Sequence, residues 1–242
     1  MNAPTDTLLA ARGARQAWDF PAGRQRLLDS FITGYLSARG QTGATVAMTA
    51  YGACVRYAPG MGRDAEHFVT ESAASLRLVP ARVGDWVTLM GPPPEVREVR
   101  GLPLRATASE FFMAAELGAL REVLEEALAP EDAEPAMRTI SPGVRAFWYP
   151  VHGEAVASLH CAKGRHQDVV IDRVRTDPAW RGRGLARGLM HAATCQVQML
   201  GATRMLLIAS PEGHRLYRRL GFETIVPVHV WVVEEAAAAA LS

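Results

Sequence analysis

The segment Trp180–Met190, WRGRGLARGLM, constrains the fold of this chain more than any other stretch. Its glycines and arginines stand directly before an apolar helical pattern, and the preceding run Gln167–Thr176 is rich in β-branched residues typical of a strand. The cap position of the expected helix holds no Ser, Thr, Asn or Asp, so its first backbone N–H groups are free to bind an anion. The order strand, loop, helix therefore predicts a site for a phosphate-bearing ligand.

Spacing separates the phosphate-binding motifs that compete for this stretch. A P-loop requires Gly-Lys-Ser/Thr, which is absent, and the dinucleotide fingerprint G-x-G-x-x-G fails because Arg187 stands at its third glycine position. The remaining pattern, Arg181-x-x-Gly184-x-Ala186, resembles the (Gln/Arg)-x-x-G-x-(Gly/Ala) signature of the GNAT superfamily of acetyl-CoA-dependent N-acetyltransferases.

A second segment, Met205–Ile225, strengthens this resemblance. It begins as a strand and passes into a short helix, for which Ser210 is a good N-cap. Its letters Leu216-Tyr217 and Leu220-Gly221-Phe222 look like the LY-x-x-x-GF element that GNAT proteins carry about thirty-five residues after their pyrophosphate loop, and Tyr217 follows Arg181 by 36 positions. The order and the spacing of the two motifs agree.

The resemblance implies an α/β (α+β) fold: a GNAT fold with a mixed central sheet, flanking helices and splayed central strands. It also implies acetyl-CoA as cosubstrate, with the pyrophosphate on the backbone of the loop and the pantetheine arm along the preceding strand. The expected cofactor-binding residues are Val174, Arg175, Thr176, Arg181, Gly182, Arg183, Gly184, Leu185, Ala186, Ser210 and Tyr217.

The strand before the loop contains a break in its pattern. Val169 and Ile171 keep a period of two, but the next apolar residue, Val174, is one step out of phase. This predicts a β-bulge near Asp172-Arg173, whose exposed amide, that of Val174, can stabilise a tetrahedral oxyanion. The strands at 168–176 and 203–209 are then expected to splay apart.

By the resemblance, Tyr217 is the general acid that protonates the leaving thiolate. An amine acceptor also needs a base, because a lysine-like amine is protonated at neutral pH. Asp172 is the leading candidate, and Asp168, Glu154 and His160 are the alternatives. The function predicted is acetyl transfer from acetyl-CoA to a primary amine by direct attack. The alternative is a catalytically weak acyl-CoA-binding sensor or interaction module.

Three regions are expected along the chain. Residues 1–94 form a smaller N-terminal α+β region, either an appended domain or a degenerate GNAT-like half, and Gly91-Pro92-Pro93-Pro94 is the linker signal. Residues 95–235 form the acetyltransferase domain, with a first strand over Val96–Arg105 and helices within Ser109–Leu128. Residues 236–242 are an alanine-rich tail.

Composition limits the partners. A formal net charge of +1 gives no global bias toward nucleic acid or membrane, and no window reaches the length of a membrane span. Three widely spaced cysteines and no N-terminal signal pattern point to the cytoplasm. No His, Cys or acidic pair has metal-ligand spacing, so no metal is expected. The acceptor is a small-molecule amine or a protein amino group, and a homodimer is compatible with the sequence.

Overall fold

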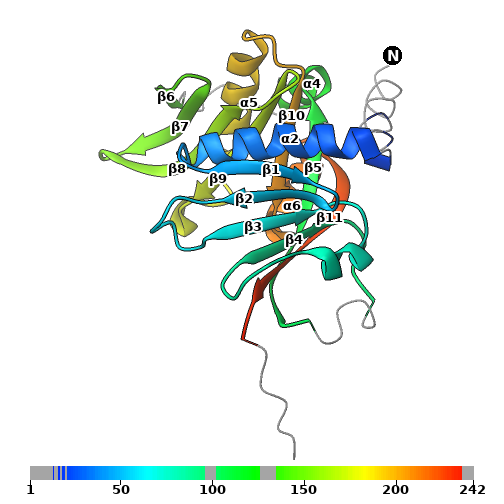
Figure 1. Cartoon of the computed structure of the whole chain (residues 1–242). Helices are drawn as coiled ribbons and strands as arrows, with labels where there is room; N and C mark the ends of the chain where they lie inside the picture. The colour runs from blue at the N-terminus through cyan, green and yellow to red at the C-terminus, as the bar shows by residue number, and fades with distance from the viewer. Residues whose placement is uncertain are drawn as a thin grey trace, which may run out of the picture.

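The computed structural model describes residues 13, 16, 18–19, 21–95, 102–125 and 135–235. Within these ranges an eleven-stranded mixed sheet forms in the order β1-β2-β3-β4-β11-β5-β10-β9-β8-β7-β6 (Figure 1). The strands are β1 (Thr45–Thr49), β2 (Gly52–Arg56), β3 (Ala65–Val69), β4 (Trp86–Met90), β5 (Leu104–Glu116), β6 (Ala136–Ser141), β7 (Val144–Val151), β8 (Glu154–Lys163), β9 (Asp168–Thr176), β10 (Arg204–Ala209) and β11 (Glu223–Val233). The predicted tail, residues 236–242, lies outside the described residues.

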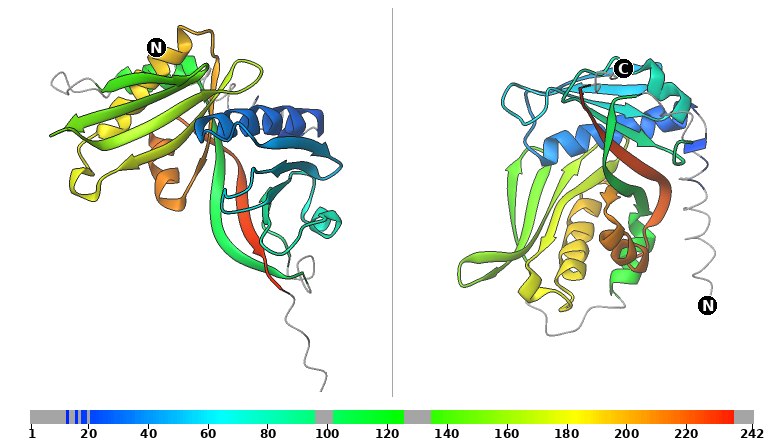
Figure 2. Two further views of the ribbon diagram at one scale, coloured as in Figure 1. Left: turned by 60° about the vertical axis from the view of Figure 1, so that its left-hand side comes forward. Right: turned by 90° about the horizontal axis from the view of Figure 1, so that it is seen from below.

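Helices cover both faces of this sheet. On one face lies α2 (Pro21–Ala38), which crosses β8 and β9, and on the other lie α4 (Leu117–Glu125), α5 (Leu185–Gln198) and α6 (Pro211–Arg219), as the two views of Figure 2 show. Two 3₁₀ segments, η1 (Ala73–Leu78) and η2 (Pro178–Trp180), complete the elements. Each face has its own apolar core, and β9 and β10 contribute alternate residues to both. None of the helices described is long and apolar enough to cross a membrane.

The N-terminal region is built into the sheet. Strand β4 pairs antiparallel with β11, from Val228 opposite Met90 to Val232 opposite Trp86, and so joins β1–β4 to the other seven strands. Helix α2 buries Leu28, Phe31 and Ile32, as its helical spacing indicates. The division of the chain at residue 94 stays a prediction, and the structure adds that one sheet runs through it.

Helix α2 lies very close to β9. Its Ser30 hydroxyl donates a hydrogen bond to the Arg165 carbonyl (2.7 Å) and accepts one from the Arg165 amide (2.9 Å). At Gly34 there is no room for a side chain, because a Cβ atom would overlap Val170 Cγ2 and lie 2.7 Å from Val170 Cβ. The glycine lets the helix pack directly against the sheet.

The prediction for residues 96–128 is wrong in part. Of the expected strand Val96–Arg105, residues 96–101 lie outside the described ranges, and β5 includes Leu104 and Arg105. The segment Ser109–Glu116, expected to be helical, continues β5, and the helix starts only at Leu117. Alanine, glutamate and methionine favour a helix locally, but β5 is paired on both sides, with β10 and with β11, and this pairing overrides propensity.

Candidate active site

A wedge opens between β9 and β10 in the middle of the sheet. The two strands pair in parallel only over Asp168–Val170 against Arg204–Leu206, and beyond that point their remaining residues have no mutual partners. On its other side β9 changes register against β8 between the pairs His160–Asp172 and Ser158–Arg175. Arg173 and Val174 of β9 therefore lie opposite the single residue Leu159 of β8, which is a β-bulge, and Arg173 has a φ of 55°. The predicted bulge and the predicted splay are both confirmed.

The N-terminus of α5 faces outward without a side-chain cap. Gly184 is its N-cap at φ 78° and ψ −3°, and within the described part of the chain no side chain caps the first turn. Gly182 also has a positive φ of 76°. Both positions need glycine, because this left-handed region is costly for other residues. The exposed amides of the first turn of α5 and the helix dipole together form a site for an anion.

The loop arginines remain available beside these amides. Arg181 is 57% exposed at its side chain and lies 3.4 Å from Glu212, a surface ion pair of the kind that contributes little. Arg183 lies over the Trp180 ring, 4.5 Å from its centroid. A phosphate-bearing ligand can therefore recruit both guanidinium groups at little cost.

Helix α6 carries the predicted acid. Its N-cap Ser210 accepts a hydrogen bond from the Gly213 amide (3.2 Å), as the sequence predicts for a cap. Tyr217 is only 6% exposed and packs edge-on against Phe222. Burial raises the pKa of the Tyr217 hydroxyl, and the negative charge of Asp172 raises it further. The phenol therefore stays protonated at neutral pH.

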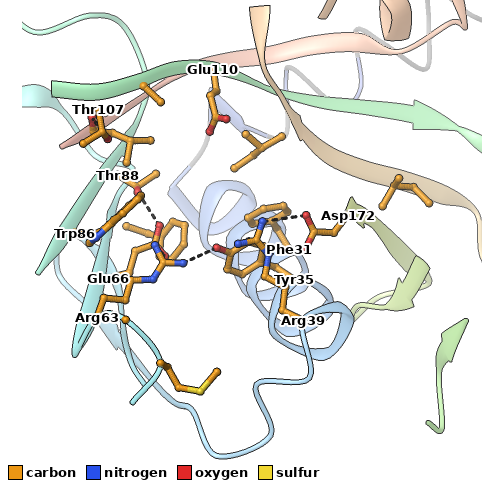
Figure 3. A pocket seen from close by; sticks show the side chains of 17 residues that line it. Phe31, Tyr35, Arg39, Arg63, Glu66, Trp86, Thr88, Thr107, Glu110 and Asp172 are labelled. Carbon is orange, nitrogen blue, oxygen red and sulfur yellow. Dashed lines mark hydrogen bonds and ion pairs between the residues drawn. The ribbon is translucent and has the colours of Figure 1, made fainter. Parts of the chain in front are cut away.

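On the other face of the sheet, under α2, a cavity of about 520 Å³ reaches the wedge (Figure 3). Ile171 and Asp172 of β9 and Ile208 of β10 line it, so both strands of the splayed pair border the cavity. The remaining walls come from α2, from β3 and β4 with the loop between β2 and β3, and from β5 and β11. They include Phe31, Tyr35, Arg39, Arg63, Glu66, Phe68, Trp86, Thr88, Thr107, Glu110 and Val230.

Two ion pairs organise the cavity wall. Arg39 binds Asp172 through two hydrogen bonds, of 2.6 and 3.1 Å. Arg63 lies 3.2 Å from Glu66 and donates a hydrogen bond to the Tyr35 hydroxyl (3.0 Å). Each arginine therefore has a carboxylate of its own.

Both arginines also cover aromatic rings of the cavity. Arg39 lies over Tyr35, 4.3 Å from the ring centroid, and Arg63 lies over Trp86, at 4.6 Å. Glu66 is satisfied as well, since it accepts hydrogen bonds from the hydroxyls of Tyr57 (2.9 Å) and Thr88 (2.8 Å).

Glu110 differs from the other two carboxylates of the cavity. Its side chain points from β5 into the space between the two ion pairs, and none of the described residues forms an ion pair or a hydrogen bond with it (Figure 3). Burial raises the pKa of Glu110; Arg39 lowers it, and the charges of Glu66 and Asp172 raise it.

The other candidates for a base lie in different surroundings. Asp168 is buried in a two-bond ion pair with Arg204, at 2.8 and 3.0 Å, where β9 and β10 still pair. The His160 ring lies 3.0 Å from the Ala38 carbonyl at the end of α2, and Glu154 is exposed at the start of β8. Asp172 is the only one of the four predicted candidates that lines the cavity.

Sequence reasoning missed most of the cavity. Tyr35, Arg39, Arg63, Glu66 and Trp86 belong to the N-terminal region, which carries no motif, and Glu110 lies in the segment taken for a helix. One signal was available. Ala108, Glu110, Phe112 and Ala114 alternate with a period of two, which places a carboxylate on an otherwise apolar strand face.

Comparison with known proteins agrees with this geometry. Residues 144–224 match the model of the acetyltransferase (GNAT) domain. No curated protein sequence matches the chain.

Several solved structures share the fold. A GCN5-related N-acetyltransferase from Kribbella flavida aligns with a TM-score of 0.58 at 14% identity, over 86% of this chain and 95% of that one. A GNAT-family protein from Novosphingobium aromaticivorans DSM 12444 gives 0.51 at 16% identity, over 86% and 97%. A tandem GNAT protein from the clavulanic acid biosynthesis pathway gives 0.51 at 12% identity, over 96% of each chain.

A splayed strand pair beside an uncapped helix N-terminus has the features that the resemblance implies for an acyl-CoA-dependent acyltransferase. The family match is confined to residues 144–224, which form a GNAT acetyltransferase domain. The chain carries this domain together with an additional N-terminal region.

Proposed function

We propose that this protein transfers the acetyl group of acetyl-CoA to a primary amine by direct attack across the wedge between β9 and β10. The observation that carries the proposal is the position of the wedge between two sites. An anion site lies at the N-terminus of α5, and the cavity under α2 is bordered by Ile171, Asp172 and Ile208 of the splayed strands. A donor and an acceptor held in these two sites would meet at the wedge.

The donor is proposed to bind mainly to main chain. Its pyrophosphate would lie on the loop Arg181–Gly184 and on the first amides of α5, those of Leu185 and Ala186, where the dipole and the arginines favour negative charge. The pantetheine arm would run beside Val174, Arg175 and Thr176, where β9 has left β10 and its edge is free to bind. Ser210 is proposed to border the cofactor at the start of α6.

The chemistry proposed uses two further groups near the wedge. The Val174 amide, released from the regular ladder by the bulge at Arg173, is placed to donate a hydrogen bond to the tetrahedral oxyanion. As the carbon–sulfur bond breaks, the Tyr217 hydroxyl protonates the thiolate. Because burial raises the pKa of Tyr217, its hydroxyl gives up a proton only to a strongly basic group. A thiolate that is excluded from water is such a base, since burial raises its pKa as well.

The sequence names Asp172 as the base, and its place on the cavity wall supports a role at the acceptor. Both of its carboxylate oxygens, however, already accept hydrogen bonds from Arg39. Asp172 would take a proton from the amine only after Arg39 releases it.

We also propose that residues 1–94 are a degenerate GNAT-like half. In support, α2 and β1–β4 continue the sheet of the second half, and the alignment with the tandem GNAT protein covers 96% of each chain. This half retains no phosphate loop motif and instead supplies walls of the cavity.

The decisive experiment is calorimetric titration of the protein with acetyl-CoA. We expect a micromolar Kd that is lost in Gly184→Glu, because that substitution adds a negative charge where the pyrophosphate would bind and a side chain where φ is 78°. Gly84→Glu is the matched control, since Gly84 also has a positive φ (88°) and open space around it but lies in the turn before β4.

A folded protein that does not bind acetyl-CoA would contradict the proposal. Binding without acetylation of any amine in a broad screen would favour the alternative, an acyl-CoA-binding sensor module.

A further inference from the structure

We propose that Glu110 binds the ammonium group of the acceptor in the cavity and accepts its proton, and that the acceptor is a small primary amine with one positive charge, an apolar or flat aromatic body and no carboxylate. The inference rests on the function proposed above, because it names the substrate class of the same site.

The charges of the cavity leave a single negative group unmatched. Among the described residues, two arginines and three carboxylates line it, and the pairs Arg39–Asp172 and Arg63–Glu66 are each neutral. Glu110 is the carboxylate that remains, and it has no polar partner among the described residues. A half-buried carboxylate without a partner is costly, so a cationic ligand is the complement that this cavity favours.

The same pairing argues against an acidic substrate. An amine that carries its own carboxylate would need a cationic partner, and both arginines already hold carboxylates at 2.6–3.2 Å. Their flat faces also lie over the rings of Tyr35 and Trp86. To bind a second carboxylate, the cavity would have to open one of these ion pairs.

The rest of the lining suits an apolar body. Phe31, Phe68 and Trp86 contribute aromatic surface, and Ile208 and Val230 contribute aliphatic surface. A volume of about 520 Å³ falls within the roughly 300–1,000 Å³ typical of small-molecule sites.

The position of Glu110 on β5 also places its carboxylate close to the wedge. In β5, Phe112 pairs with Ile208 of β10, and Glu110 lies two residues further along on the same face. This places the carboxylate just past the end of β10, where the wedge meets the cavity (Figure 3). An ammonium bound to Glu110 would therefore lie beside the proposed path to the thioester.

Glu110 takes one proton from the ammonium and later passes it to solvent, and the neutral nitrogen attacks the thioester carbon. The carbon–sulfur bond breaks, the sulfur takes a proton from Tyr217, and the second proton lost by the nitrogen restores Tyr217. The products are the acetamide, free CoA and one released proton. Burial, which raises the pKa of Glu110, makes its carboxylate a better base than an exposed one, whereas Arg39 opposes this and Glu66 and Asp172 add to it.

The first test is direct binding, which does not depend on turnover. Calorimetry of the full chain with 2-phenylethylamine and with phenylalanine compares an amine with its carboxylated counterpart. We expect the amine to bind at least 10-fold more tightly, and Glu110→Gln to weaken it about 10- to 100-fold, as for the loss of a charge-assisted hydrogen bond. Glu116→Gln is the matched control, a carboxylate on the same strand whose pKa burial also raises but which pairs across from Arg204 outside the cavity.

The second test is the rate of acetylation, followed by loss of thioester absorbance. Glu110→Gln should lower kcat/KM for the amine by about 10²- to 10⁴-fold and remove the acid limb of its pH profile, with the Kd for acetyl-CoA unchanged. Glu110→Asp should restore part of the rate, and Glu116→Gln should leave it unchanged.

The outcomes separate the two proposals. Absence of acetyl-CoA binding would overturn the proposed function, while the binding test still decides whether Glu110 holds an amine. Acetylation that proceeds equally in Glu110→Gln and Glu116→Gln, or a preference for phenylalanine, would overturn the inference and leave the proposed function intact.

Discussion

The close approach of α2 to β9 gives a prediction that joins the fold to the site. In Gly34→Ala the new Cβ atom would lie 2.7 Å from Val170 Cβ and 3.2 Å from the Ala162 carbonyl oxygen, against an optimum of about 3.5–4.0 Å for two carbons. Val170 is fully buried in the sheet, so neither neighbour is the free end of a flexible side chain. Helix α2 would have to move outward.

The magnitude follows from two opposing effects. Overpacking of a core costs about 1–3 kcal/mol, and the severity of this contact argues for the upper half of that range. Replacing glycine by alanine inside a helix returns about 1 kcal/mol. We therefore expect a net loss of about 1–2 kcal/mol in the free energy of unfolding, or a Tm lower by roughly 2–8 °C for a chain of this size.

Gly34→Ala should also weaken binding of the amine. Tyr35 follows Gly34 directly and Arg39 comes immediately after the end of α2, so a displaced α2 moves the acceptor wall while the N-terminus of α5 stays in place. We expect a higher KM for the amine and an unchanged Kd for acetyl-CoA. Thermal unfolding, steady-state kinetics and calorimetry measure the three quantities.

Gly118→Ala is the control for this prediction. Gly118 lies in α4 with no atom within 4 Å of a new Cβ, so its Tm should stay the same or rise. If Gly34→Ala were as stable as the unchanged protein, the close packing of α2 on β9 would be refuted, along with its role in forming the cavity.

Two further predictions concern the titrating groups. Tyr217→Phe should lower kcat about 10²- to 10⁴-fold without changing the Kd for acetyl-CoA, and an unaffected kcat in stopped-flow or steady-state assays would exclude Tyr217 as the acid. Glu110→Gln should raise the Tm at neutral pH, because burial raises the pKa of Glu110 and the native protein then loses stability as pH rises through that value. The difference in Tm between the variant and the unchanged protein should shrink toward low pH, where Glu110 is protonated in both the folded and the unfolded chain. A difference in Tm that stays constant from pH 4 to pH 8 would contradict this account.

The sequence by itself determined the donor half of the site. The loop at Arg181–Gly184, the helix after it, the cap at Ser210 and the break before Val174 are local features, and each depends on a few adjacent residues. Backbone conformation, capping and strand period are encoded at that range, so the helix start, the bulge and the splay could all be predicted.

Only the tertiary structure decided the acceptor half. Glu110 enters the cavity because β5 is inserted between β10 and β11, although its alanines and glutamates favour a helix. Arg39 reaches Asp172 across 133 positions of chain because Gly34 lets α2 pack against the sheet. These residues share no motif and no local pattern. Their meeting depends on strand order and on the packing of one helix, which arise from long-range pairing and burial rather than from any single segment.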